Sequence, residues 1–254
     1  MEDYYESRMP LIGDIAPAFH ARTTQGEIDF PKDYCGKWVI FFSHPGDFTP
    51  VCTTEFMTFA SMMQEFRDLN TELLGLSIDT IYAHIAWLRK IQELVWKDIK
   101  HVEVTFPLIE DITMEIAGKY GMIHPNMSGT QTVRAVFIID PEGRIRAILY
   151  YPASTGRNTE ELKRMILALQ KADCEGIATP ANWMPCEDVI LPPPNSCGGA
   201  RERLAGVDQE QGGYCLDWFL CFRQSGCSSC QENVMPQVPE YFSRYQNRRN
   251  YYRR

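Results

Sequence analysis

The sequence lacks long apolar runs, an excess of basic residues and internal repeats. No stretch approaches the roughly 18 consecutive apolar residues of a membrane-spanning helix, and the acidic, tyrosine-rich segment 1–10 contains no apolar stretch. We therefore expect no membrane association and a cytoplasmic location. The formal net charge of −8 disfavours a nucleic-acid-binding surface over the whole molecule, because phosphates would be repelled.

The composition is that of an ordinary globular protein, with 44% hydrophobic and 23% charged residues. At about 150 residues per domain, 254 residues fit one large domain or one domain with an appendage. The nine cysteines are an odd number and are spread unevenly, which argues against a secreted disulfide framework. They suggest reactive thiols, a metal site or small buried hydrophobic residues.

Alternating strand and helix patterns run through the first two thirds of the chain. The apolar run 38–42 predicts a central strand, and apolar residues three and four apart predict a helix over 53–68. A second strand is expected over 72–79 and a second helix over 81–94. Residues 134–139 and 144–151 predict a hairpin, because Asp140-Pro141-Glu142-Gly143 between them has a turn composition. Asn158 is the expected cap of the next helix. These patterns alone indicate an α/β fold.

The pattern changes near Asp173, and the frequent prolines between Asp173 and Cys197 exclude a regular helix in that segment. We interpret 1–172 as a catalytic domain, 173–240 as a C-terminal arm and 241–254 as a basic tail. That tail carries five arginines and three tyrosines between 244 and 254. A solvated disordered tail is favoured over binding to RNA, a membrane surface or an acidic partner.

The segment 44–55, HPGDFTPVCTTE, carries the clearest chemical signal. It places Cys52 at or just inside a helix N-terminus, where unpaired N–H groups and the helix dipole favour thiolate over thiol. Thr49, one turn earlier, can bring its hydroxyl beside the sulfur. Arg134 is the candidate for a fixed cation that polarises a substrate.

Pro45, Thr49 and Cys52 reproduce the Pro-x-x-x-Thr-x-x-Cys motif of the peroxiredoxins. Further stretches, at 134–141, 151–158 and 182–185, resemble the peroxiredoxin-6 type, so the resemblance covers roughly residues 10–196. It implies a thioredoxin fold, with a central mixed sheet flanked by helices and a C-terminal arm. It also implies homodimers that often close into decamers.

The resemblance implies that Cys52 is oxidised to a sulfenic acid by hydrogen peroxide or organic hydroperoxides, without a cofactor or a metal. The resemblance also implies that Pro45 shields Cys52 and that Thr49 and Arg134 activate it. Glu55 and Arg157 are expected to position Arg134, and His44 is expected to contact the site. A thioredoxin-like protein or another thiol is the expected reductant, and antioxidant defence the expected role.

The run 214–221, YCLDWFLC, is similar to the tail of archaeal members. By that resemblance Cys221 is the first choice for the thiol that resolves the sulfenic acid, and Cys215 the second. In those relatives the tail reaches the partner subunit, so the expected disulfide is intermolecular.

Other features depart from the pattern. Animal members with phospholipase activity carry a serine where Asp33-Tyr34-Cys35-Gly36-Lys37 stands, so no lipase function is expected and Cys35 is interpreted as incidental. Cys227 and Cys230 could join Cys215 and Cys221 in a zinc site, but the spacing is not finger-like. A second redox pair or adventitious cysteines are favoured instead.

Two other functional classes remain open. A thioredoxin-like disulfide oxidoreductase would need Cys-x-x-Cys at the helix start, where Thr49-x-x-Cys52 stands. The function of a non-catalytic, chaperone-like ring or of a tail-mediated binding module would not be lost in Cys52→Ser. The histidines outside the motif show no mutual ligand spacing, so core or surface roles are expected for His20, His84, His101 and His124.

Overall fold

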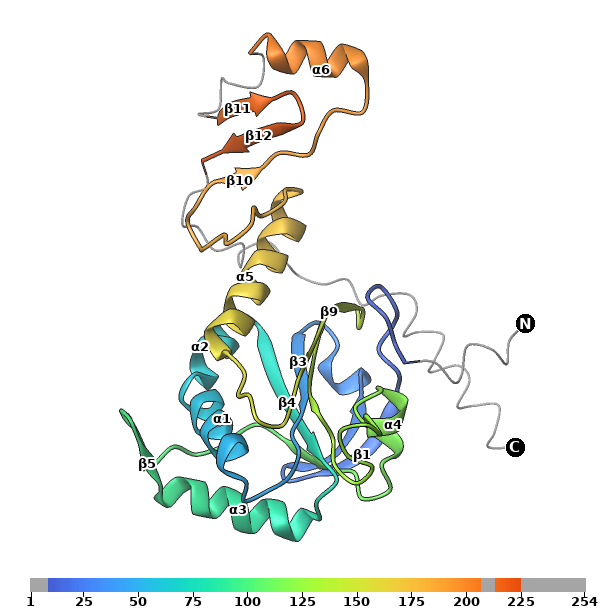
Figure 1. The fold of residues 1–254 in the computed structure, drawn as a ribbon, viewed down its shortest axis with the longest axis vertical. Helices are drawn as coiled ribbons and strands as arrows, with labels where there is room; N and C mark the ends of the chain where they lie inside the picture. Colours follow the sequence, from blue (N-terminus) through green and yellow to red (C-terminus); the bar gives the residue numbers. More distant parts are fainter. Residues whose placement is uncertain (1–8, 207–212, 225–254) are drawn as a thin grey trace, which may run out of the picture. The chain divides into compact units, whose positions relative to one another are not determined.

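The computed structural model describes residues 9–206 and 213–224 and forms two compact units (Figure 1). The first extends to Thr159 and the second begins at Glu160. The predicted boundaries at 172 and 240 stay predictions. Within the described residues, no helix has the length and apolar character needed to cross a membrane.

A seven-stranded mixed sheet forms the centre of the first unit, in the order β2-β1-β7-β4-β3-β8-β9. Strands β3, β4 and β7 are parallel, and the other neighbours are antiparallel. The strands are β1 (Phe19–Thr23), β2 (Gly26–Phe30), β3 (Trp38–Ser43), β4 (Thr71–Ser77), β7 (Leu108–Glu110), β8 (Arg134–Ile139) and β9 (Ile145–Tyr151). The prediction of a mixed sheet with flanking helices is confirmed, and so is the β8–β9 hairpin.

Helices pack beside this sheet (Figure 1). They are η1 (Lys32–Tyr34), α1 (Pro50–Ser61), α2 (Met63–Asp68), α3 (Ile81–Glu93) and α4 (Glu115–Lys119), and a small hairpin joins β5 (Val95–Trp96) to β6 (Ile99–Lys100). The predicted helix 53–68 begins earlier, because Pro50 fits the first helical position. It is also interrupted at Met62, which separates α1 from α2.

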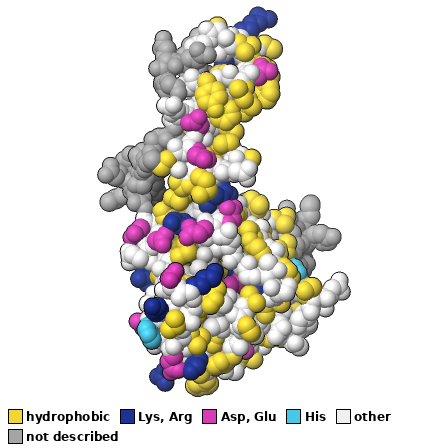
Figure 2. All heavy atoms as spheres, turned by 60° about the vertical axis from the view of Figure 1, so that its left-hand side comes forward, with side chains coloured by type: hydrophobic (Ala, Val, Ile, Leu, Met, Phe, Trp, Pro, Cys, Tyr) yellow, Lys and Arg dark blue, Asp and Glu magenta, His cyan; other side chains and the backbone are white. Residues whose placement is uncertain are grey.

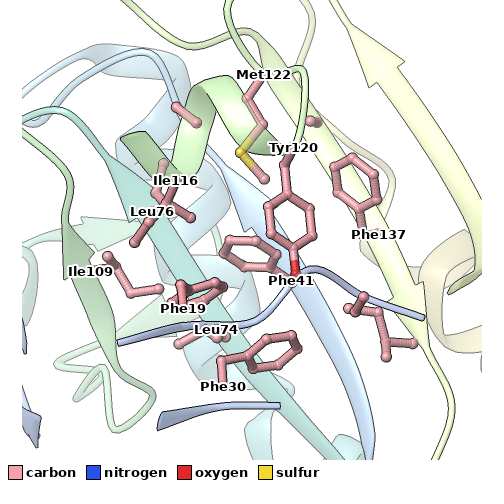
Figure 3. Packing of buried hydrophobic residues seen from close by; sticks show 14 of the residues in the cluster. Phe19, Phe30, Phe41, Leu74, Leu76, Ile109, Ile116, Tyr120, Met122 and Phe137 are labelled. Carbon is pink, nitrogen blue, oxygen red and sulfur yellow. The ribbon is translucent and has the colours of Figure 1, made fainter. Parts of the chain in front are cut away.

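One face of the sheet carries an aromatic core (Figure 3). The ring of Tyr120 lies edge-on to Phe41, at 4.9 Å between centroids, and to Phe137, at 5.2 Å. Its hydroxyl donates to the carbonyl of Pro17 at 2.7 Å, so the buried polar atom is paired. This core fixes β3 and β8 relative to each other.

The opposite face of β3 carries a second aromatic layer, because successive side chains of a strand point to opposite sides. Phe42 stacks on Phe59 at 4.7 Å and meets Phe56 at 5.7 Å. Both partners lie on α1, so this layer holds the helix that carries Cys52 against the sheet. Trp87 of α3 packs on Phe56 at 4.6 Å.

The second unit contains a long helix, a short helix and a small antiparallel sheet in the order β10-β12-β11. Its elements are α5 (Thr159–Glu175), β10 (Val189–Ile190), α6 (Cys197–Leu204), β11 (Gly213–Asp217) and β12 (Leu220–Arg223). The start of α5 agrees with the predicted cap at Asn158. Trp183, Val189 and Ile177 form part of its small core, and Arg223 pairs with Glu175 at 2.7 Å.

Candidate active site

Cys52 is the third residue of α1 and its side chain is fully buried. The first turn is set by Thr49, whose extended backbone precedes Pro50. The first N–H groups of a helix have no partner within it, so they surround this sulfur with positive partial charge. The Thr49 hydroxyl does not cap the helix but donates to the carbonyl of Gly46 at 2.8 Å. That bond leaves the oxygen's lone pairs free to accept.

Arg134, the first residue of β8, brings a buried cation to the sulfur. Its Nη1 donates to Sγ of Cys52 at 3.2 Å and to Oε2 of Glu55 at 2.6 Å. Its Nε and Nη2 donate to the carbonyl of Ala153 at 3.2 and 2.8 Å. The guanidinium is therefore held on both sides, with one edge turned to the sulfur.

Glu55 lies one helical turn after Cys52 and binds two arginines. Oε1 accepts from Arg157 N and Nε at 2.8 and 2.9 Å, and Oε2 accepts from Arg157 Nη2 at 2.6 Å. Burial alone would raise the pKa of Glu55, but the charge and hydrogen bonds of Arg157, followed by the charge of Arg134, hold it below its ordinary value. The carboxylate is therefore an anion at neutral pH.

The buried cluster holds two cations and one anion before the sulfur is counted. An unbalanced charge is costly in a medium of low dielectric constant. The cluster therefore presents a net positive charge to the sulfur of Cys52. The same charges polarise any oxygen that approaches the sulfur.

Arg157 also joins the site to the core beneath it. Its guanidinium carbon lies 4.9 Å from the ring centre of Phe42 and 5.7 Å from that of Phe59. Its Nη1 donates to the carbonyls of Ser43 and Ala135 at 2.9 and 3.2 Å. Every edge of this arginine is thus fixed, and it positions Glu55 in turn.

A second buried network lies in the loop before α1. Asp47 accepts from Nε2 of His44 at 3.0 Å and from Nδ1 of His84 at 2.7 Å. Burial would raise the pKa of Asp47, but these two hydrogen bonds hold it below its ordinary value. Burial lowers the pKa of His44 despite the nearby carboxylate. Among the described residues, its Nδ1 has no hydrogen-bond partner.

These two networks also show which residues could hold a metal. His44, Asp47 and Asp79 have one ligand atom each within 4.8 Å of one another. Those groups already serve as hydrogen-bond partners, since Oδ2 of Asp79 accepts from Oγ of Ser77 at 2.7 Å and from N of Asp47 at 2.9 Å. A cation would have to break that network, so the donor set fits a structural role better.

The structure brings four of the predicted residues into direct contact, namely Cys52, Glu55, Arg134 and Arg157. Thr49 lies in the same helical turn as Cys52, and His44 belongs to the network of Asp47. Pro45 is buried in the loop, and its shielding of the sulfur stays a prediction. The carbonyl of Ala153 and the pairing of Asp47 with His84 were not predicted from the sequence.

Cys215 and Cys221 form a disulfide with each other, and Cys52 is a free thiol. A four-thiolate zinc site is not compatible with this bond, and Cys227 and Cys230 lie outside the described residues. Cys186 also takes part in a disulfide. Among the described residues, Cys35, Cys174 and Cys197 are also free. Burial raises the pKa of Cys35, which agrees with an unreactive thiol.

Comparisons with known proteins agree with this geometry. Residues 12–148 match the AhpC/TSA family, and residues 168–205 match the C-terminal domain of 1-Cys peroxiredoxin. A peroxiredoxin of Methanosarcina mazei is 63% identical over 217 residues, covering 85% of this chain and 98% of that protein. A peroxiredoxin of Aquifex aeolicus is 49% identical, covering 84% of this chain and 96% of its own length.

Solved structures confirm the predicted thioredoxin-type fold. The yeast mitochondrial 1-Cys peroxiredoxin has a TM-score of 0.74 at 39% identity and covers 85% of this chain and all of its own. A cysteine-to-serine mutant of peroxiredoxin 6 of Arenicola marina has a TM-score of 0.72 at 31% identity, covering 85% of this chain and 99% of its own. This chain therefore belongs to the peroxiredoxin family of thiol-dependent peroxidases.

Proposed function

We propose that this enzyme reduces hydrogen peroxide and organic hydroperoxides through a sulfenic acid on Cys52, in antioxidant defence. The contact that carries the proposal is the 3.2 Å hydrogen bond from Arg134 Nη1 to Sγ of Cys52. A charged donor at that distance both stabilises a thiolate and lies where a peroxide oxygen must arrive.

The reaction starts with attack of the Cys52 thiolate on one peroxide oxygen. The S–O bond forms as the O–O bond breaks, and the second oxygen leaves as hydroxide or alkoxide and takes up a proton from water. Cys52 is then a sulfenic acid, oxidised by two electrons. Arg134 stabilises the charge that develops on the departing oxygen, and the Thr49 oxygen accepts a hydrogen bond from the bound peroxide.

Resolution needs a second thiol, and Cys52 is too buried to meet one without a local change. We infer that the first turn of α1 opens after oxidation. Cys221 of the partner subunit then condenses with the sulfenic acid and releases water. Attack of Cys215 on that intermolecular disulfide frees Cys52 and closes the Cys215–Cys221 bond. This scheme needs at least a homodimer, and a decamer built from dimers belongs to the same proposal.

An external thiol must then reopen the hairpin disulfide. The yeast mitochondrial relative is described as resolved through glutathione and thioredoxin systems, and we propose a thioredoxin-like reductant for this enzyme. A cytoplasmic location is part of the proposal, because a reducing compartment supplies the thiol reductant that the cycle needs.

Treatment with one equivalent of hydrogen peroxide, followed by non-reducing mass mapping, tests this function. The reduced wild type is compared with Cys52→Ser, Cys215→Ser, Cys221→Ser and, as a control, Cys197→Ser, which removes an exposed free thiol. We expect the Cys215–Cys221 disulfide as the end product in the wild type and the control, and an interchain Cys52–Cys221 linkage that accumulates in Cys215→Ser. Cys221→Ser should accumulate sulfenic or sulfinic Cys52. A Cys52 that stays unreacted in Cys221→Ser would refute the peroxidase proposal, and a sulfenic Cys52 without any linkage in Cys215→Ser would mean a one-cysteine cycle.

A further inference from the structure

The two cysteines of the C-terminal hairpin differ in their surroundings. They lie directly opposite each other, with Cα atoms 4.0 Å apart. Cys215 is on β11, which is an edge strand, whereas Cys221 is on β12, which lies between β10 and β11. Cys221 is 1% exposed, and Cys215 is partly exposed. The order of the strands therefore leaves Cys215 partly exposed and covers Cys221.

Several contacts hold Cys221 in this covered position. Its carbonyl accepts from N of Leu191, just beyond β10, at 2.9 Å. Its neighbour Phe222 pairs with Ile190 of β10. Arg223, two residues after Cys221, binds Glu175 of α5 at 2.7 Å. Nothing comparable covers the outer edge of β11 among the described residues, because no strand pairs with that edge.

The side chains around the hairpin turn are apolar and exposed. Leu216, Trp218 and Phe219 are 70%, 40% and 51% exposed. Hydrophobic side chains gather on the surface of this second unit (Figure 2). The disulfide thus lies beside an apolar surface that a protein, rather than a small charged thiol, can contact.

Thiol–disulfide exchange depends on which sulfur an incoming thiolate can reach. We propose that the reducing partner is a protein dithiol that attacks Sγ of Cys215, and that Cys221 is the leaving thiolate. This inference rests on the proposed function, because it gives a direction to the last step of that cycle. Attack at Cys215 also releases the resolving thiol of Cys221 before the thiol of Cys215.

The electron balance explains why a dithiol is needed. The first thiolate of the reductant bonds to Cys215 while the Cys215–Cys221 bond breaks, and Cys221 takes a proton. The second thiol of the reductant attacks its own sulfur in the mixed disulfide and releases Cys215. Two electrons and two protons pass to the hairpin, and the reductant becomes a disulfide. A monothiol that has bonded to Cys215 is expelled again, because Cys221 lies directly opposite Cys215 and attacks the mixed disulfide. The Cys215–Cys221 bond then re-forms.

The direction of attack can be tested on the full chain without peroxide. Cys52→Ser is oxidised with diamide, the remaining thiols are blocked with N-ethylmaleimide, and a thioredoxin variant that keeps only its attacking cysteine is added with iodoacetamide. The alkylating agent captures the leaving thiolate before it can return. We expect thioredoxin attached to Cys215 and carbamidomethyl on Cys221, in excess over the reverse product by at least about tenfold.

A second measurement tests the need for a dithiol. Dithiothreitol should open the blocked hairpin disulfide, whereas glutathione at equal thiol concentration should leave it closed. Attachment of thioredoxin to Cys221, equal amounts of the two products, efficient opening by glutathione, or no hairpin disulfide after diamide would each overturn the inference. Failure of the proposed function would be seen separately, as a missing Cys52–Cys221 linkage in Cys215→Ser in the peroxide experiment.

Discussion

The Nη1 atom of Arg134 lies 3.2 Å from the sulfur of Cys52. The other side of the same guanidinium is bound twice by the carbonyl of Ala153. This pairing cannot slide or rotate, because each nitrogen of the arginine already has a partner. The sulfur therefore meets a cation whose position is set before any substrate binds.

Arg134→Lys keeps the charge but loses the planar fork that reaches Cys52, Glu55 and Ala153 together. We expect the second-order rate constant for hydrogen peroxide to fall by about 100-fold or more, as for loss of a preorganised donor. Stopped-flow kinetics on the reduced enzyme measures it. Arg144→Lys, at an exposed position, is the control and should leave the rate unchanged. An unchanged rate in Arg134→Lys would show that charge alone is enough.

Glu55→Gln should destabilise the fold, because it leaves two buried guanidinium groups without their shared carboxylate. The expected loss in the free energy of unfolding is about 3–5 kcal/mol, measured by urea denaturation. Glu93→Gln removes an exposed ion pair with Lys90 and should cost less than about 1 kcal/mol. Equal losses in the two variants would contradict the view that burial decides the effect.

Thr49→Val removes the hydroxyl that donates to Gly46 and can accept from the peroxide, while Thr49→Ser keeps it. We expect Val to lower the peroxide rate constant by about 10- to 100-fold, as for a lost transition-state hydrogen bond. Ser should retain most of the rate. If both variants behaved alike, the methyl group rather than the hydroxyl would be the important part of Thr49.

Stability should fall as the solution is acidified from neutral pH. The folded-state pKa of His44 lies below its ordinary value of 6.5, so between these two values the unfolded chain binds a proton that the folded chain does not. Stability therefore decreases as the pH drops below about 6.5. Asp47 and Glu55, whose pKa values are depressed, add a loss at lower pH, as their folded-state carboxylates become protonated.

Urea denaturation at pH 7.5, 6.5 and 5.5 measures this slope for the wild type, His44→Asn and the exposed-histidine control His20→Asn. The slope near pH 6 should flatten in His44→Asn and persist in His20→Asn. A wild-type stability that stays constant from pH 7.5 to 5.5 would contradict a neutral, buried His44.

The central features of the fold and the site followed from local patterns. The apolar run at 38–42 and the turn at 140–143 are signals within a few residues of each other, and β3 and the β8–β9 hairpin lie where they predict. Thr49 and Cys52 belong to a motif whose chemistry is readable from residue types, and Arg134 was proposed separately as a cation at the head of a core strand. The sequence pattern predicts the start of α1 at Thr53, which is too late, because Pro50 is a favourable first helical residue as well as a common loop residue.

The contacts that were missed join distant residues or use the backbone. The carbonyl of Ala153 that holds Arg134 belongs to a residue whose side chain gives no signal. His84 reaches Asp47 across 37 positions, through the packing of α3 against the loop. The Cys215–Cys221 pairing depends on two short strands, β11 and β12, which period-2 patterns over four or five residues do not distinguish from irregular chain.

Strand β3 supports the hydrophobic core on one face and the active site on the other. Phe41 points into the core that Tyr120 completes, and its neighbour Phe42 supports Arg157 from the other face. A thermostabilisation campaign that repacked this strand would therefore alter the floor of the active site as well. Libraries intended to raise thermal stability should leave Phe42 unchanged. Otherwise the selected variants will be more stable but will have a lower peroxidase rate.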